Sequence, residues 1–201
     1  MNIRPFVAAL SLLALTTVPA MAQDKPKETP PPGMDQAAME AMMKAMTPGE
    51  NHKHIARYAG DWTFTNKMWM DPSQPPAESS GTMHGETILD GRYVQATWKG
   101  NMMGTPFEGR GTHGYDNLSK QYVSTWIDNM ATGIMYSTGT CDAAGKRCED
   151  KGDMMDPMTG QKSYMRTVTT WTSDKSFTME MYGPGPSGQE VKMMEFVVTK
   201  K

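Results

Sequence analysis

Residues 61–70, DWTFTNKMWM, decide the fold class, because here the apolar residues begin to recur with a period of two. One face carries Trp62, Phe64, Met68 and Met70, and the other carries Thr63, Thr65 and Lys67. A period of two places successive side chains on opposite faces of a β-strand. The same period returns at residues 93–98, 122–127 and 177–182. We therefore expect the chain from Trp62 onward to consist of strands.

Short turn signals separate these runs at regular intervals. They are Asp71-Pro72, Asp90-Gly91, Asp116-Asn117, Ala144-Gly145, Thr159-Gly160, Ser173-Asp174 and Ser187-Gly188. Short strands at this spacing, with no helix between them, predict an all-β antiparallel meander of about nine or ten strands. Closing the sheet into a barrel, or nearly so, removes the exposed edges that invite aggregation.

Several strands carry large side chains on both faces, as Trp69 and Trp126 illustrate. In a barrel with an internal cavity, one face of each strand lines the interior while the other is partly covered. A packed β-sandwich is the alternative arrangement for the same strands. We expect the barrel.

Two short helices should precede the strands. Residues 34–46 are rich in Ala, Met, Glu, Gln and Lys and contain no β-branched residue, which favours a helix. A second helix is expected over residues 48–58, with Thr47 as its cap, Pro48 at its first position and Glu50 at capping-box spacing. Gly60 would stop it. We expect this second helix to plug one end of the sheet.

The N-terminal segment has the features of an export signal. Arg4 precedes an apolar run over residues 6–18, and Ala20-Met21-Ala22 supplies small residues at a cleavage site. The run is shorter than the about 20 residues needed to span a bilayer. We expect residues 1–22 to be a cleaved secretory signal, which places the protein in the periplasm or outside the cell. A retained membrane anchor is the alternative.

The rest of the chain forms one domain's worth of sequence after a tether. Residues 23–33 are rich in proline and charge, which is typical of a solvated, extended linker. Residues 34–201 are long enough to bury a core of their own. We expect them to form a single barrel domain.

The charge balance argues against two classes of partner. The formal net charge is −2, and removing Arg4 with the leader leaves 20 − 1 = 19 cations against 22 acids, or −3. No basic stripe is present to bind nucleic acid. No polybasic segment is present to hold anionic lipid, and we expect no membrane span after signal cleavage.

The two cysteines, Cys141 and Cys148, flank a turn centred on Ala144-Gly145. If residues 143–146 form a hairpin loop, the two side chains face each other across it, and an oxidising compartment would join them. A metal-binding pair is the competing interpretation, but metal ligands usually lie two to four residues apart, and no second pair exists. We expect a disulfide that pins the hairpin, adding about 2 kcal/mol.

Gly60-Asp61-Trp62, at the head of the first predicted strand, resembles the Gly-x-Trp signature of lipocalin and calycin barrels. Longer stretches are similar to a bacterial family known as domain of unknown function 1579, over roughly residues 34–200. They are residues 39–50 (MEAMMKAMTPGE), 67–72 (KMWMDP), 106–117 (PFEGRGTHGYDN), 120–135 (KQYVSTWIDNMATGIM) and 180–195.

The resemblance implies a calycin-like barrel, a type whose known members mostly carry small hydrophobic ligands or haem. It transfers no site residue and no activity. We therefore expect a small apolar ligand inside the barrel, and no cofactor. From the alternation, the residues expected to line or close the cavity are Trp62, Phe64, Trp98, Trp126, Phe177 and Phe196.

The chain has 22 methionines, of which Met1 and Met21 lie in the leader. Met39, Met42, Met43 and Met46 recur at helical spacings of three and four, so their thioethers can share one face. Thioethers select Cu(I), which makes copper binding an alternative function. The plainer interpretation is that methionine replaces leucine as a pliable apolar residue, since only Leu89 and Leu118 follow the leader.

Four histidines are the remaining candidates for chemistry. His84 and His113 fall on predicted strands, where either could face inward and ligate a haem iron or another metal. His52 and His54 lie in the second predicted helix, and we expect them to be surface residues. No nucleophile elbow and no phosphate-binding loop is present, so an enzyme of unknown class ranks third. The ligand's identity and the oligomeric state stay open.

Overall fold

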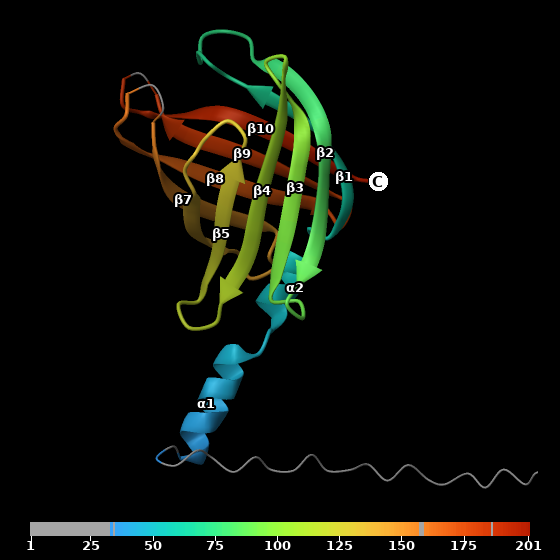
Figure 1. The fold of residues 1–201 in the computed structure, drawn as a ribbon, viewed down its shortest axis with the longest axis vertical. Helices are drawn as coiled ribbons and strands as arrows, with labels where there is room; N and C mark the ends of the chain where they lie inside the picture. Colours follow the sequence, from blue (N-terminus) through green and yellow to red (C-terminus); the bar gives the residue numbers. More distant parts are fainter. Residues whose placement is uncertain (1–32, 34, 157–158, 186) are drawn as a thin grey trace, which may run out of the picture. The chain divides into compact units, whose positions relative to one another are not determined.

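The computed structural model describes residues 33, 35–156, 159–185 and 187–201. The predicted signal and all but Gly33 of the predicted tether lie outside the described residues. Two helices precede ten antiparallel strands that close into a barrel (Figure 1). The elements are α1 (Gln36–Met46), α2 (Glu50–Ala56), β1 (Gly60–Met68), β2 (Ala77–Ile88), β3 (Tyr93–Met102), β4 (Thr105–Asp116), β5 (Gln121–Asp128), β6 (Met135–Cys141), β7 (Arg147–Met155), β8 (Lys162–Ser173), β9 (Ser176–Pro184) and β10 (Glu190–Lys200).

The sheet is a complete meander in which every strand pairs with its neighbours in sequence. β1 also pairs with β10, so Phe64 lies opposite both Gly81 on β2 and Val198 on β10. This last pairing closes the barrel and leaves no unpaired edge strand among its ten members. The predicted fold class is therefore confirmed, and the sandwich alternative is excluded.

A meander sends its connections alternately to the two ends of the barrel. The turns after β2, β4, β6 and β8 lie at the end where α2 packs, which we call the helix end. Asn117, after β4, donates to the carbonyl oxygens of Ala45 and Thr47, and Arg57, just after α2, donates to the carbonyl of Gly145 in the turn after β6. The other five loops lie at the opposite end. α2 therefore plugs one end, as expected.

The core gathers beside Tyr58, just after α2, where side chains of β1, β8 and β9 meet. Trp62 and Phe177 are fully buried there, and their rings meet Trp171 at centroid distances of 6.0 and 4.8 Å. The Trp62 indole donates through Nε1 to the carbonyl of Tyr58, at 3.0 Å. Gly85 makes room for this arrangement, since a Cβ at that position would lie 2.1 Å from the Tyr58 carbonyl oxygen.

The start of α2 differs from the predicted one. Gly49 is the N-cap, and its backbone N–H donates to His52 Nδ1 at 3.0 Å. Thr47 instead donates through Oγ1 to the carbonyl of Met43, in the last turn of α1. The chain therefore uses Thr47 to end the first helix rather than to begin the second, because the hydroxyl finds an orphan carbonyl behind it.

Neither helix resembles a membrane segment. α1 has no buried residue, and α2 buries only His52 and Ile55. In the described part of the chain, no helix is long and apolar enough to cross a bilayer.

Candidate functional site

The barrel encloses a cavity of about 270 Å³, lined from α2 and from every one of the ten strands. Eight-stranded barrels enclose either packed side chains or one small ligand, and the diameter grows with strand number. Ten strands therefore leave space even where large aromatic rings point inward. The volume lies close to the lower end of the range found for small-molecule sites, about 300–1,000 Å³.

Aromatic rings form one wall of this cavity. Phe64, Trp98 and Phe196, from β1, β3 and β10, pack against one another with ring centroids 5.3 to 5.7 Å apart. Trp126 on β5 stacks on Phe107 of β4, and its Nε1 donates to Asp128 Oδ2 at 2.8 Å. These rings offer a broad apolar surface, on which the Trp126 N–H is already bonded.

Methionines fill much of the remaining apolar lining. They are Met83, Met102, Met130, Met135, Met179, Met181 and Met194, from β2, β3, β6, β9, β10 and the loop after β5. Methionine is unbranched and polarizable, so such a lining adapts to ligands of differing shape.

Five of the six residues expected from alternation line the cavity: Phe64, Trp98, Trp126, Phe177 and Phe196. Trp62 is not among the lining residues, because it packs beneath them, against Trp171 and Phe177. Whether any of the six contacts a ligand stays a prediction.

A polar wall, which the sequence analysis missed, lies on β6, β7 and β8. It consists of Ser137, Asp150, Thr167 and Thr169, and the last two pair in register with Asp150 and Cys148. Burial, with a smaller contribution from Glu149, raises the pKa of Asp150 to about 7. β7 carries charged residues on both faces, so the alternation of its residues did not show which face points into the barrel. The disulfide could have done so, because Asp150 shares a face with Cys148 two residues earlier.

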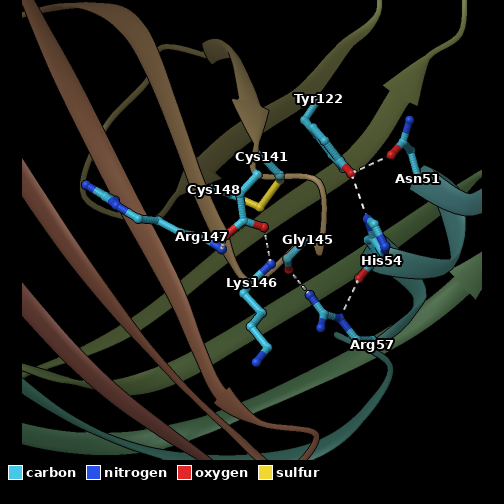
Figure 2. The surroundings of a disulfide bond; sticks show 10 residues. Asn51, His54, Arg57, Tyr122, Cys141, Gly145, Lys146, Arg147 and Cys148 are labelled. Carbon is cyan, nitrogen blue, oxygen red and sulfur yellow. Dashed lines mark hydrogen bonds between the residues drawn. A yellow bond between two sulfur atoms is a disulfide. The ribbon is translucent and has the colours of Figure 1, made fainter.

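The helix end of the cavity is closed by contacts from α2 and its C-cap Arg57 to β5 and the β6–β7 hairpin (Figure 2). Arg57 donates to the carbonyls of Gly145 and His54, and its guanidinium lies 4.3 Å from the centroid of the Trp171 ring. His54 Nδ1 lies 3.0 Å from the Tyr122 hydroxyl, which in turn donates to Asn51 at 3.0 Å. These bonds hold the plug in place.

The expectation that His52 and His54 are surface residues is wrong. His52 is 7 % exposed, bonds the N-cap backbone and meets the Tyr115 ring edge-on. His54 is partly buried against Tyr122. Both side chains meet tyrosines of the barrel, Tyr115 on β4 and Tyr122 on β5, so they are engaged rather than solvated.

The predicted disulfide between Cys141 and Cys148 is present. The two residues lie directly opposite each other on β6 and β7, with Cα atoms 3.9 Å apart. Both also line the cavity. The bond therefore fixes the hairpin whose turn receives Arg57.

The two candidate metal-binding histidines on strands face opposite ways. His84 is exposed on the outside of β2, and its Nδ1 lies 2.7 Å from Asp61 Oδ1. His113 on β4 lines the cavity and stacks on Tyr58 at a centroid distance of 5.3 Å. Burial lowers the pKa of His113 to about 4, so its imidazole is neutral at physiological pH. Of the two, His113 is the one that could reach an interior ligand.

The methionines of α1 do not enter the core. Met42, Met43 and Met46 are 41, 49 and 62 % exposed, and Met39 is partly exposed. These four methionines therefore fill no gap in the barrel core. Across the described residues, no group of three or more His, Cys, Asp or Glu side chains is placed to hold a metal ion.

Comparison with known proteins supports the fold and leaves the chemistry open. Residues 47–200 match the model of a family described as "Protein of unknown function (DUF1579)". No curated protein matches. The barrel resembles the crystal structure of Rv2717c from M. tuberculosis, with 10% identity and a TM-score of 0.58 over 77% of this chain and 99% of that one. A redesigned β-barrel, b11L5F_LGL, aligns at 12% identity over 74% of this chain and 95% of that one, with a TM-score of 0.38.

Proposed function

This chain belongs to the DUF1579 family of proteins of unknown function, and within that family we propose that its barrel binds a small, largely apolar ligand in its interior. The observation that carries the proposal is the cavity of about 270 Å³ with its aromatic and methionine lining. Apolar surface left inside a folded protein gains from contact with an apolar ligand, at about 25 cal/mol per Å² buried.

The site of action is an oxidising compartment, either the periplasm or the outside of the cell. The disulfide Cys141–Cys148 supports this placement, because disulfides persist where thiols are not kept reduced. The export signal expected over residues 1–22 agrees with it.

Binding of an environment-sensitive apolar fluorophore tests the proposal. The domain should bind the fluorophore, and Met179→Trp should abolish binding because the larger ring occupies the cavity. Thr178→Trp is the matched control, since residue 178 lies next to Met179 on β9 but points outward. Equal binding by wild type and both variants would place the fluorophore outside the barrel and contradict the proposal.

The second candidate function is copper binding through α1, and the exposure of the α1 methionines supports it. Four thioethers at spacings of three and four residues, none of them buried, could converge on one Cu(I) ion. Haem ligation through His113 would use the cavity itself, and an absorption spectrum of the purified protein would reveal it.

A further inference from the structure

The cavity has two chemically different sides. The aromatic rings of β1, β3 and β10 form one side, and the polar wall on β6, β7 and β8 forms another. Ser137, Thr167 and Thr169 on that wall are 2, 7 and 4 % exposed. A uniformly apolar ligand would leave the Asp150 carboxylate on this wall uncompensated, so the wall indicates a ligand with a polar group.

Acceptors in the cavity lack partners. Among the described residues, the Asp150 carboxylate has neither a hydrogen bond nor an ion pair, and its largest electrostatic neighbour is the like-charged Glu149. Asn66 on β1, 5 % exposed, lines the cavity with its Oδ1 unbonded in the described part of the chain, while its Nδ2 donates to Ser79 at 3.4 Å. Buried acceptors of this kind normally have partners.

Several donors in the cavity are already engaged. Arg57 donates to two backbone carbonyls and stacks on Trp171. The Tyr122 hydroxyl donates to Asn51, and Trp126 Nε1 donates to Asp128. The neutral His113 ring carries no charge that could attract an anion. A carboxylate head group would therefore meet the like-charged Asp150, whereas a donor-bearing head group would meet free acceptors.

We propose that the ligand is an amphipathic amine, whose protonated nitrogen binds the Asp150 carboxylate while its apolar body lies along the aromatic wall. This inference rests on the proposed function of the cavity. An ammonium group presents two or three N–H donors, so it can bond Asp150 together with Ser137 or Thr167 beside it. Charge-assisted bonds of this kind are about twice as strong as neutral ones.

The site should respond to pH through Asp150. The other ionisable groups that line the cavity are His54, Arg57, Tyr58, His113, Tyr122, Asp128 and Glu149. Arg57, Asp128 and Glu149 are engaged elsewhere, the last with Arg147 and Arg166 on the outside. Burial raises the pKa of Tyr58 to about 12, so this phenol stays neutral. Amine binding should therefore strengthen as the pH rises through the pKa of Asp150, near 7.

Competition against the apolar fluorophore, with octylamine, octanol and octanoate as competitors of equal chain length, tests the head group. At about pH 8, octylamine should bind at least about ten-fold more tightly than octanol or octanoate. Asp150→Asn should remove that preference, so that octylamine binds no more tightly than octanol. Asp153→Asn is the matched control, because it makes the same charge change on the outer face of β7.

The outcomes separate the two proposals. Equal affinity for the three competitors, tightest binding of octanoate, or an amine preference that survives Asp150→Asn would overturn the amine proposal while interior binding stands. Failure of wild-type protein to bind the fluorophore and all three competitors would overturn both proposals. Thermal unfolding of each variant confirms that the barrel is folded in every comparison.

Discussion

At the scale of single residues, burial acts in opposite directions on two side chains that line the cavity. It raises the pKa of Asp150 from 3.8 to about 7, and it lowers the pKa of His113 from 6.5 to about 4. Asp150 holds its proton more tightly in the folded state, so its contribution to stability falls as the pH rises from about 4 to 7. His113 binds a proton more tightly when unfolded, so its contribution is lost as the pH falls from 6.5 to 4. The effects of Asp150 and His113 on the pH dependence of stability therefore partly cancel.

Replacing either side chain should reveal the pH dependence of stability that the other contributes. Asp150→Asn should stabilise the protein at about pH 8 by up to a few kcal/mol, since each unit of pKa corresponds to about 1.4 kcal/mol, and should do little near pH 4. His113→Phe, which keeps a ring against Tyr58, should remove the loss of stability between pH 6.5 and 4. Urea unfolding across this pH range measures both. A pH-independent effect of Asp150→Asn would contradict the burial of a charged carboxylate.

Two independent constraints require a glycine at position 145. Its φ is +60°, and a Cβ there would lie 2.5 Å from His54 Nδ1. Gly145→Ala should therefore cost about 2 kcal/mol or more, as strain and a displaced His54 combine. Gly160→Ala is the matched control, because Gly160 has φ +66° and nothing within 4 Å of such a Cβ. Equal losses in thermal unfolding would show that the contact with His54 is unimportant.

Which way a residue faces was predictable only where one face of its strand was plainly apolar. Trp62 and Phe64 alternate with threonines, and both point inward. On β5, Val123 and Ile127 alternate with Tyr122 and Trp126, so the inward placement expected for Trp126 had little support from hydrophobicity, although Trp126 does line the cavity. The strand register in the closed barrel fixes the orientation of β5. It places Trp126 beside Gly111 and turns Ile127 outward, where it is 46 % exposed.

At the scale of elements, the β6–β7 hairpin and α2 act as one unit at the helix end. The disulfide fixes the hairpin, and the turn at residues 142–146 receives Arg57 through the Gly145 carbonyl (Figure 2). Local signals predicted each element: turn residues for the hairpin, composition for the helices. Their docking depends on contacts between residues 88 positions apart, which no local pattern encodes.

Loss of the disulfide should loosen this unit before the rest of the barrel. The double variant Cys141→Ser, Cys148→Ser should lose about 2 kcal/mol of stability, because the unfolded chain regains freedom across a separation of 7 residues. Amide exchange should quicken in the turn and in α2, and change little in the β1–β3 pairs, which lie on another part of the barrel. Reduced wild-type protein is the control and should behave alike. Uniformly faster exchange would contradict a local role.

At the scale of the whole molecule, a ten-stranded barrel is wider than its own side chains can fill. The strand count followed from the spacing of turns, but the cavity depends on strand number, tilt and shear together, which exist only in the closed sheet. The interior is therefore available for a ligand, while α1, which buries no residue, carries a separate apolar stripe. The two features support different functions that one experiment can separate.

Replacing Met39, Met42, Met43 and Met46 together by leucine should separate the cavity from the methionine stripe. Leucine keeps the apolar stripe and the helix propensity but removes every thioether from α1. If the cavity is the functional site, the variant should bind the apolar fluorophore as wild type does, since none of the four lines the cavity. We expect this result, with weak or no stoichiometric Cu(I) uptake by either protein. Tight one-to-one Cu(I) binding by wild type that disappears in the variant, measured by competition with a chromogenic Cu(I) chelator, would instead make the helix the functional site.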